Sequence, residues 1–257
     1  MKGCFILQRR FLYIGHELAI LLKEKGIVEE FCAYVQVRDG YDFLKKQTDI
    51  RYSDVLLDED IFKSALKETI DHEYLKKLER EYGVLWQFLS VDRIVRFGQL
   101  VREYPNDTPP YSYEEMLKLV QGFAKRIEHL LDSEKPDFVY LLQPGSLGTL
   151  LLYTMAKKRG IRTFATQVPS MRDIVSISDS YERITGAEEA CKDHQKTPLQ
   201  SIPRYEEAKR FIDEFRSKPT AYSSVVLGRE KSGRLRQLDF LLPRNILNTV
   251  YFNFYQI

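Results

Sequence analysis

The chain has 257 residues, of which 44% are hydrophobic and 30% charged, so it is long enough to bury a core of its own. Its net charge of +2 arises from 39 basic and 37 acidic residues, which argues against the strong positive field of a nucleic-acid-binding protein. No apolar run approaches the roughly 20 residues of a membrane-spanning helix, and the apolar stretch before Arg9 is too short for a signal peptide. We therefore expect a cytoplasmic protein without a nucleic-acid partner, and leave open a peripheral contact with the inner face of the membrane.

The chain begins with a pattern typical of a βαβ unit. Residues 3–7 are apolar and predict a strand, and residues 8–15 predict a loop. A helix is expected from His16 to the stop at Gly26, followed by a second strand over residues 30–37. Such a unit has parallel strands and a right-handed crossover.

The middle of the chain is mostly helical in pattern and rich in charge. A short strand is expected over residues 54–57. Ser112 and Glu115 have the spacing of a capping box, which predicts a helix that runs to about Asp132. Its apolar side would contain Met116, Leu119, Val120, Phe123, Ile127 and Leu130.

A second βαβ pattern follows and organises the chain. Residues 138–142 and 161–168 predict strands, and residues 149–159 predict the helix between them. The fold class expected is α/β, a Rossmann-like parallel sheet flanked by helices. Open α/β sheets bind ligands at the carboxyl ends of their strands, which points to the loops over residues 143–148 and 169–179.

Two candidate groups lie in the loops expected at this edge of the sheet. Gly15 and His16 would stand where the first loop enters the first helix, so that His16 could act as a general base; alternatively, it only caps the helix. Gly145 and Ser146 could hold phosphate or sugar hydroxyls, or form a tight turn with Ser146 as the helix cap.

The second loop offers Arg172 and Asp179. The Arg172 guanidinium could bind a phosphate or carboxylate, or pair with an acid of its own loop. Asp92, with two arginines close behind it, could bind a polyhydroxylated ligand or form a buried ion pair between helices. The sequence contains no metal-binding or cofactor motif, and Cys4, Cys32 and Cys191 show no metal spacing, so we expect free thiols and neither metal nor cofactor.

Several of these segments together carry a family resemblance. They are the Gly15-His16 opening, residues 78–83 leading to Asp92-Arg93, Lys135-Pro136-Asp137, residues 156–161, and the loop from Arg172 to Ser178-Asp179. In this combination residues 3–186 resemble the amino-terminal half of capsule and surface polysaccharide biosynthesis proteins. Those proteins are similar to two-lobed GT-B glycosyltransferases, so the resemblance implies one lobe of a GT-B fold.

The resemblance implies sugar transfer from a nucleotide-activated donor to a glycan or lipid-linked acceptor. In such enzymes the amino-terminal lobe mainly holds the acceptor and often supplies the base, for which His16 is the candidate by position. Gly15, Gly145, Ser146, Arg172 and Asp179 would bind substrate, and no metal is obligatory.

Domain organisation is implied by the same resemblance. Residues 1–217 would form the Rossmann-like lobe, and residues 218–257 a linker and helical segment leading to a second, nucleotide-binding lobe absent from this chain. Two alternatives stay open: a non-catalytic Rossmann-like module that binds a sugar or nucleotide, and a sugar-nucleotide epimerase-like enzyme.

Overall fold

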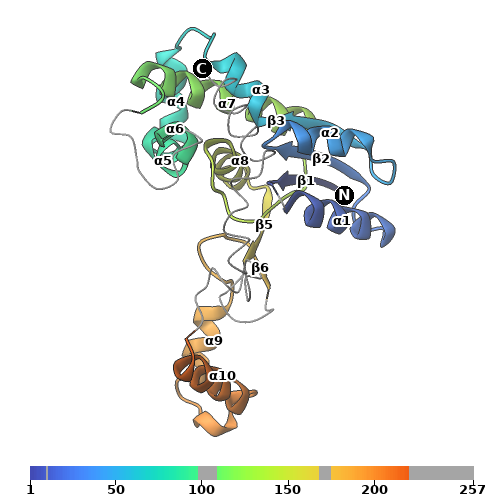
Figure 1. Ribbon diagram of the computed structural model, residues 1–257, viewed down its shortest axis with the longest axis vertical. Coiled ribbons are helices and arrows are strands. Elements are labelled where there is room, and N and C mark those ends of the chain that lie inside the picture. Colours follow the sequence, from blue (N-terminus) through green and yellow to red (C-terminus); the bar gives the residue numbers. More distant parts are fainter. Residues whose placement is uncertain (10, 98–108, 168–174, 220–257) are drawn as a thin grey trace, which may run out of the picture. The chain divides into compact units, whose positions relative to one another are not determined.

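The structure, a computed structural model, describes residues 1–9, 11–97, 109–167 and 175–219 (Figure 1). The described residues belong to two compact units, one ending at Glu188 and the other containing residues 189–219. The first unit holds the sheet. Its end at Glu188 comes before residue 217, the end expected for the Rossmann-like lobe.

A six-stranded sheet forms the centre of the first unit, with strand order β3-β2-β1-β4-β5-β6. The first five strands in this order are parallel, and β6 alone pairs antiparallel, with β5. The protein is therefore α/β with a Rossmann-like sheet flanked by helices, as predicted. The strands are β1 (Lys2–Leu7), β2 (Glu30–Val35), β3 (Tyr52–Leu57), β4 (Phe138–Leu141), β5 (Arg162–Gln167) and β6 (Ser176–Ser178).

The helices form two groups along the chain, before and after β4. Those up to β4 are α1 (Phe11–Glu24), α2 (Arg38–Lys46), α3 (Asp58–Ala65), α4 (His72–Tyr82), α5 (Leu85–Val91), α6 (Arg93–Phe97) and α7 (Tyr113–Glu134). Those after β4 are α8 (Leu147–Lys158), α9 (Ala187–His194), the 3-10 helix η1 (Leu199–Ser201) and α10 (Tyr205–Ser217).

The two faces of the sheet pack into two separate hydrophobic clusters. Helices α1 and α2 contribute to one cluster, with Phe5 and Phe31 from the strands, and α3 to α8 contribute to the other, with Ile6 and Tyr34 (Figure 1). This division follows from alternation along each strand, which sends successive side chains to opposite faces. It also follows from the right-handed crossovers: the connection from β1 runs toward β2 and the connection from β4 runs toward β5, in opposite directions along the sheet, so their helices lie on opposite faces. Both faces of the parallel strands are thereby covered, as such sheets require.

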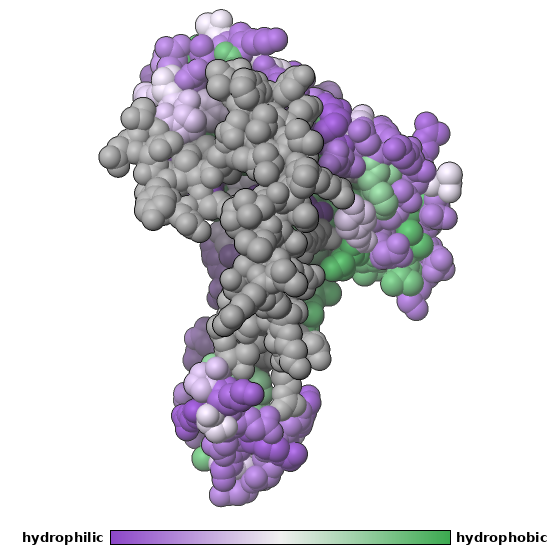
Figure 2. Space-filling view, viewed as in Figure 1, coloured by the Kyte–Doolittle hydropathy of each residue, from purple (hydrophilic) through white to green (hydrophobic). Residues whose placement is uncertain are grey.

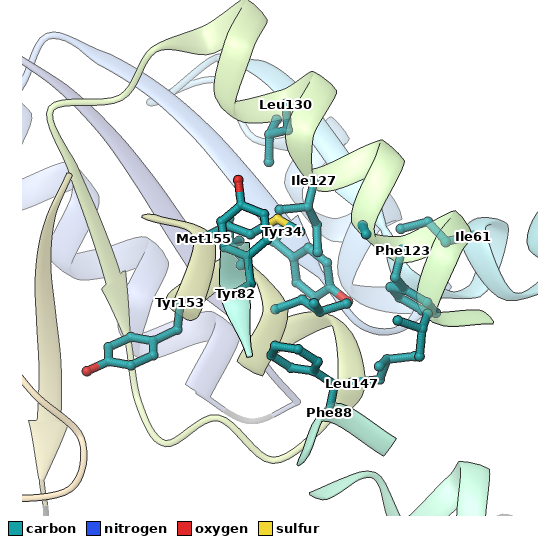
Figure 3. Packing of buried hydrophobic residues seen from close by; sticks show 14 of the residues in the cluster. Tyr34, Ile61, Tyr82, Phe88, Phe123, Ile127, Leu130, Leu147, Tyr153 and Met155 are labelled. Atoms are coloured by element: carbon teal, nitrogen blue, oxygen red, sulfur yellow. The ribbon is translucent and has the colours of Figure 1, made fainter. Parts of the chain in front are cut away.

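The second cluster packs α7 and α8 against the sheet. The apolar side predicted for the helix after Ser112 is buried at every position from Met116 to Leu130, and the predicted capping box between Ser112 and Glu115 is present. Tyr34 reaches from β2 among side chains of these helices, including Phe123 and Leu147 (Figure 3).

The Lys135-Pro136-Asp137 segment ends α7 and starts β4. Lys135 takes the left-handed backbone conformation that terminates the helix, with φ of 45°. The Asp137 carboxylate then accepts the backbone N–H of Lys2 at 2.7 Å, which fixes β4 beside β1 at the amino ends of both strands. In this chain the segment contributes to the packing of the sheet.

The first helix begins five residues earlier than the sequence predicted, at Phe11 instead of His16. Gly15, expected at the end of a loop, lies inside the helix and packs directly on β1, because a Cβ there would stand 2.5 Å from Leu7 Cδ2. The glycine therefore serves close helix-sheet packing. In this region hydrophobic residues lie among hydrophilic ones on the surface (Figure 2), and α1 exposes Tyr13, Ile14 and Leu21.

The second unit contains part of α9 together with η1 and α10. Helix α10 is amphipathic, with Ile212 and Phe215 on its apolar side. None of its residues is buried, including Ile212 and Phe215 of its apolar side. The described part of the chain therefore leaves Ile212 and Phe215 exposed.

Candidate functional site

The strand order creates a topological switch point between β1 and β4. The chain leaves β1 toward β2 on one side and leaves β4 toward β5 on the other, so the loops after these neighbouring strands diverge. In open α/β sheets a ligand-binding crevice forms at such a point, outside the carboxyl ends of the strands. The loops concerned are Gln8-Arg9 after β1 and residues 142–146 after β4.

Three glutamines stand at this carboxyl edge. Gln8 follows β1 directly, and its side-chain nitrogen is buried without a hydrogen-bond partner. Gln36 follows β2, and its Nε2 donates to Ser146 Oγ at 3.0 Å, which links the ends of β2 and β4 across β1. Phe5 of β1 pairs with Tyr140 of β4, and the same register places Gln8 opposite Gln143, just beyond the ends of these two strands. We name Gln8, Gln36, Gly145 and Ser146 the carboxyl-edge site.

Ser146 caps α8, which is one of the two alternatives that the sequence left open. Its Oγ accepts the Thr149 N–H, and the Thr149 hydroxyl accepts the Ser146 N–H at 3.0 Å, which completes a capping box. Ser146 is 6% exposed, whereas Gly145 beside it is exposed. The loop thus presents Gly145 outward, while Ser146 holds the helix and accepts from Gln36.

Asp92 lies beneath this loop and joins two helix N-termini. Its Oδ2 accepts the backbone N–H of Leu147 at 2.9 Å, the first residue of α8, and its Oδ1 accepts the N–H of Ile94 at 2.8 Å and that of Val95 at 3.2 Å in α6. Burial raises the pKa of Asp92, and the backbone hydrogen bonds and Arg96 oppose this rise. Asp92 therefore binds backbone amides, where the sequence left open a ligand or an ion pair.

Tyr34 and Asp58 complete a buried polar cluster with Asp92. Tyr34 comes from β2 and is 0% exposed, and Asp58 directly follows β3 and is 6% exposed. Burial raises the pKa of both groups well above their ordinary values, and each also feels the charge of Asp92. They lie close together, yet Tyr34 Oη and Asp58 Oδ1 have no partner at normal hydrogen-bond geometry. Gly148 of α8 lies against this cluster, because a Cβ there would stand 1.8 Å from Tyr34 Oη.

The position expected for His16 is wrong. His16 lies within α1, is 1% exposed, and has its Nδ1 3.0 Å from the hydroxyl of Tyr52, the first residue of β3. Burial lowers the pKa of its imidazole. The expectation failed because the helix begins at Phe11, which turns Gly15 and His16 toward the sheet and away from the loop after β1. Its role as a base stays a prediction, and the observed surroundings are those of a packed core residue.

The second loop predicted at the carboxyl edge also lies differently. Because β6 runs antiparallel to β5, the chain turns back before Asp179, and the backbone oxygen of Asp179 accepts from Thr163 near the start of β5. The Asp179 side chain accepts from the Thr185 hydroxyl at 2.6 Å and orders a turn. Asp179 is therefore away from Ser146, and Arg172 lies outside the described residues.

Residues of this region that sequence reasoning missed share one signal. Gln8, Gln36 and Asp58 each stand at or next to the residue that follows a parallel strand. Polar side chains in those positions meet at one edge of a parallel sheet, so the pattern could have been found once three strands were assigned. Tyr34 could not, because a tyrosine inside a strand has no feature that distinguishes a core residue from a site residue.

The described ranges contain no group of three or more His, Cys, Asp or Glu arranged to hold a metal ion. Within those same ranges, no helix is both long and apolar enough to cross a membrane.

Comparisons with known proteins add little to this description. No protein-family model matches the chain, and no curated protein matches it. Among solved structures, a UDP-GlcNAc 2-epimerase from Methanocaldococcus jannaschii matches 67% of this chain with 15% identity and a TM-score of 0.36. A further UDP-N-acetylglucosamine 2-epimerase matches 91% of it with 13% identity and a TM-score of 0.31. The matched regions span 33% and 46% of those chains, and similarity this weak supports no statement about function.

Proposed function

We propose that this chain is the acceptor-side lobe of a glycosyltransferase that transfers sugar from a nucleotide-activated donor, and that it holds a glycan at the carboxyl-edge site. The family resemblance of residues 3–186 suggests the reaction class and a place in surface polysaccharide biosynthesis. The geometry supports the narrower part of the proposal, that the site binds a sugar. The single observation that carries it is the unpaired, buried amide of Gln8 at the switch point between β1 and β4.

The chemistry of the site fits hydroxyl groups. Gln8 offers an amide donor, Gln36 and Ser146 form a hydrogen-bonded amide–hydroxyl pair, and Gly145 leaves its backbone open to a ligand. Sugar hydroxyls both donate and accept, as do amides and hydroxyls. A buried donor left unpaired costs about 1–3 kcal/mol, so a ligand oxygen that accepts from Gln8 would recover that free energy on binding.

Ligand-detected NMR of this chain tests the proposal. We expect saturation transfer to unactivated oligosaccharides in a panel that also contains nucleotide sugars, each tested separately. Gln8→Leu should weaken oligosaccharide binding about tenfold, because one buried hydrogen bond is lost at nearly constant side-chain volume. Gln195→Leu, at an exposed glutamine of the second unit, is the matched control and should bind like the wild type.

Binding of nucleotide sugars but not of oligosaccharides would reject the acceptor-side assignment. Absence of any carbohydrate binding would reject the sugar site altogether.

One observation favours a second candidate, a non-catalytic sugar-binding module. Asp58 and Asp92, the acids near the carboxyl-edge site, are buried, with exposed fractions of 6% and 2%, and His16, which lies away from that site, is 1% exposed. A general base must reach the proton that it removes. A transfer assay with donor, acceptor and the full-length protein separates the two candidates. If the full-length protein folds and binds glycan but shows no turnover, the sugar-binding module is favoured. If the His16→Ala variant folds and keeps full turnover, His16 is not the base.

A further inference from the structure

Asp92 is placed where a ligand's phosphate would be expected in a Rossmann-like protein. The N-terminus of a helix that follows a parallel strand attracts anions, because its first N–H groups are unpaired and its dipole is positive there. Phosphates of nucleotides bind at such positions in dinucleotide-binding folds. Helix α8 follows β4 at the switch point, and its first N–H, that of Leu147, is bound by the Asp92 carboxylate.

The carboxylate is held firmly in this place. It accepts three backbone N–H groups, at 2.8, 2.9 and 3.2 Å, and Asp92 is 2% exposed. Two of these bonds come from α6, so the side chain is fixed from its own turn as well as from α8. Hydrogen bonds to a charged acceptor are stronger than those between neutral groups. An incoming phosphate would have to break them and would also be repelled by the negative charge.

The rest of the cluster, Tyr34 and Asp58, supplies no positive side chain. Asp58 and Tyr34 lie on the same side of the loop, and Asp92 acts on the pKa of both. Because burial raises the pKa of Asp58, this acid keeps its proton more readily than an exposed one, so the negative charge that opposes a phosphate is that of Asp92. The residues that stand above them, Gln36 and Ser146, are neutral.

We propose that Asp92 determines the specificity of the loop after β4: its carboxylate occupies the anion position of α8, so the loop receives the neutral, hydroxylated part of a ligand and excludes its phosphate. The choice of a sugar as that ligand rests on the proposed function. The occupation of the anion position by Asp92 does not.

The test is to remove the charge and ask whether an anion takes its place. In Asp92→Asn the side chain keeps its shape but is neutral, and its amide cannot accept from both helices. We expect the Leu147 amide to shift saturably in ¹H–¹⁵N spectra when inorganic phosphate is added to this variant, and to stay unmoved in the wild type. Equal phosphate response of both proteins, or none in the variant, would overturn the proposal.

Asp92→Ala gives a second, independent measurement. It leaves space for a small carboxylate, so formate should raise the melting temperature of this variant by more than it raises that of the wild type. Asp71→Ala is the matched control, because Asp71 is an exposed aspartate that caps α4 alone, accepting the Tyr74 N–H at 3.0 Å. If formate raises the melting temperatures of the wild type, Asp92→Ala and Asp71→Ala equally, its effect is a general one of the added salt, and the proposal is contradicted.

The two variants are complementary if one fails to fold. Should Asp92→Ala not fold without formate, its recovery in formate counts for the proposal and its failure to recover counts against it. The outcomes also separate this inference from the proposed function. A wild-type protein that binds no carbohydrate, combined with phosphate uptake by Asp92→Asn, rejects the sugar site and retains the role of Asp92 at α8.

Discussion

Gly148→Ala is the substitution whose effect the structure specifies most closely. A Cβ at this position would stand 1.8 Å from Tyr34 Oη and 2.8 Å from Phe123 Cδ1, in a region where both neighbours are fully buried. Overpacking of a core costs about 1–3 kcal/mol and occasionally more, and the shorter of these contacts places Gly148→Ala at the upper end. Alanine is better than glycine in a helix by about 1 kcal/mol, so we expect a net loss of about 2 kcal/mol or more.

A double-mutant cycle with Tyr34→Phe shows whether this contact is the cause. Tyr34→Phe removes the hydroxyl that a Cβ would strike and also an unpaired buried polar atom, so alone it should stabilise the protein by about 1 kcal/mol. The double variant should recover part of the loss and not all of it, because Phe123 Cδ1 and the Tyr34 ring carbon Cζ would still stand 2.8 Å from the new Cβ.

Urea unfolding followed by the fluorescence of Trp86, the single tryptophan, is a suitable assay. With a slope of about 2 kcal/mol per molar urea, Gly148→Ala should lower the midpoint by about 1 M. Gly145→Ala, in the loop that precedes α8, is the control, because the nearest atom to its Cβ would be 4.0 Å away, and it should leave the midpoint unchanged. A Gly148→Ala midpoint equal to that of the wild type would refute the packing of α8 against Tyr34.

Buried polar groups give four further predictions. His16→Ala should lower the free energy of unfolding by about 2–4 kcal/mol, because it leaves a cavity and an unpaired Tyr52 hydroxyl; an unchanged melting temperature would argue for a surface role. Burial lowers the pKa of His16 below 6.5, so the folded state favours the neutral ring, and wild-type stability should fall as the pH drops below about 6.5 while that of the alanine variant falls less. Burial raises the pKa of Asp58, so the folded state keeps this proton to a higher pH than the unfolded state does. The protein should therefore lose stability as the pH rises from the pKa of Asp58 in the unfolded state to its higher pKa in the folded state. Asp58→Asn should flatten this pH dependence and raise the neutral-pH midpoint of urea unfolding. Gln121→Leu should lower the free energy of unfolding by about 2 kcal/mol in thermal denaturation, since the Gln121 side chain accepts the Asp71 N–H at 2.7 Å and donates to the Thr69 carbonyl at 2.9 Å. An unchanged free energy would mean that other contacts hold the loop between α3 and α4.

The sheet could be predicted from sequence because its signals are local. Strands β1, β2 and β4 are mostly apolar, the second half of β3 is apolar, and β5 is rich in residues that favour strands. The helices after Ser112 and Ser146 begin with side chains that cap them. Parallel pairing follows once strands alternate with helices, since such crossovers permit little else. The predicted strand boundaries agree with the observed ones to within two residues in each of these five strands.

The failures have a common cause in contacts between distant residues. Residues 8–10, which precede α1, contain no Ser, Thr, Asp or Asn that would mark its start in the sequence. A glycine inside a helix also resembles a loop until the strand beneath it is known. The loop from residue 169 to Asp179 was expected to stay at the carboxyl edge, but β6 pairs with β5 and carries the chain back. The sequence of β6, Ser-Ile-Ser, is too short to indicate either the strand or its direction.

The amino-acid sequence by itself determined the α/β class, the alternation of strands with helices and the caps of the long helices, because these depend on residues close together in the chain. Tertiary structure alone decided which polar groups share the carboxyl edge and which are buried. Asp92 and Leu147 are 55 residues apart, and Gln36 and Ser146 are 110 apart. Only the folding of the sheet brings such pairs within hydrogen-bond distance, so the site depends on the register of its strands as well as on the residues that line it.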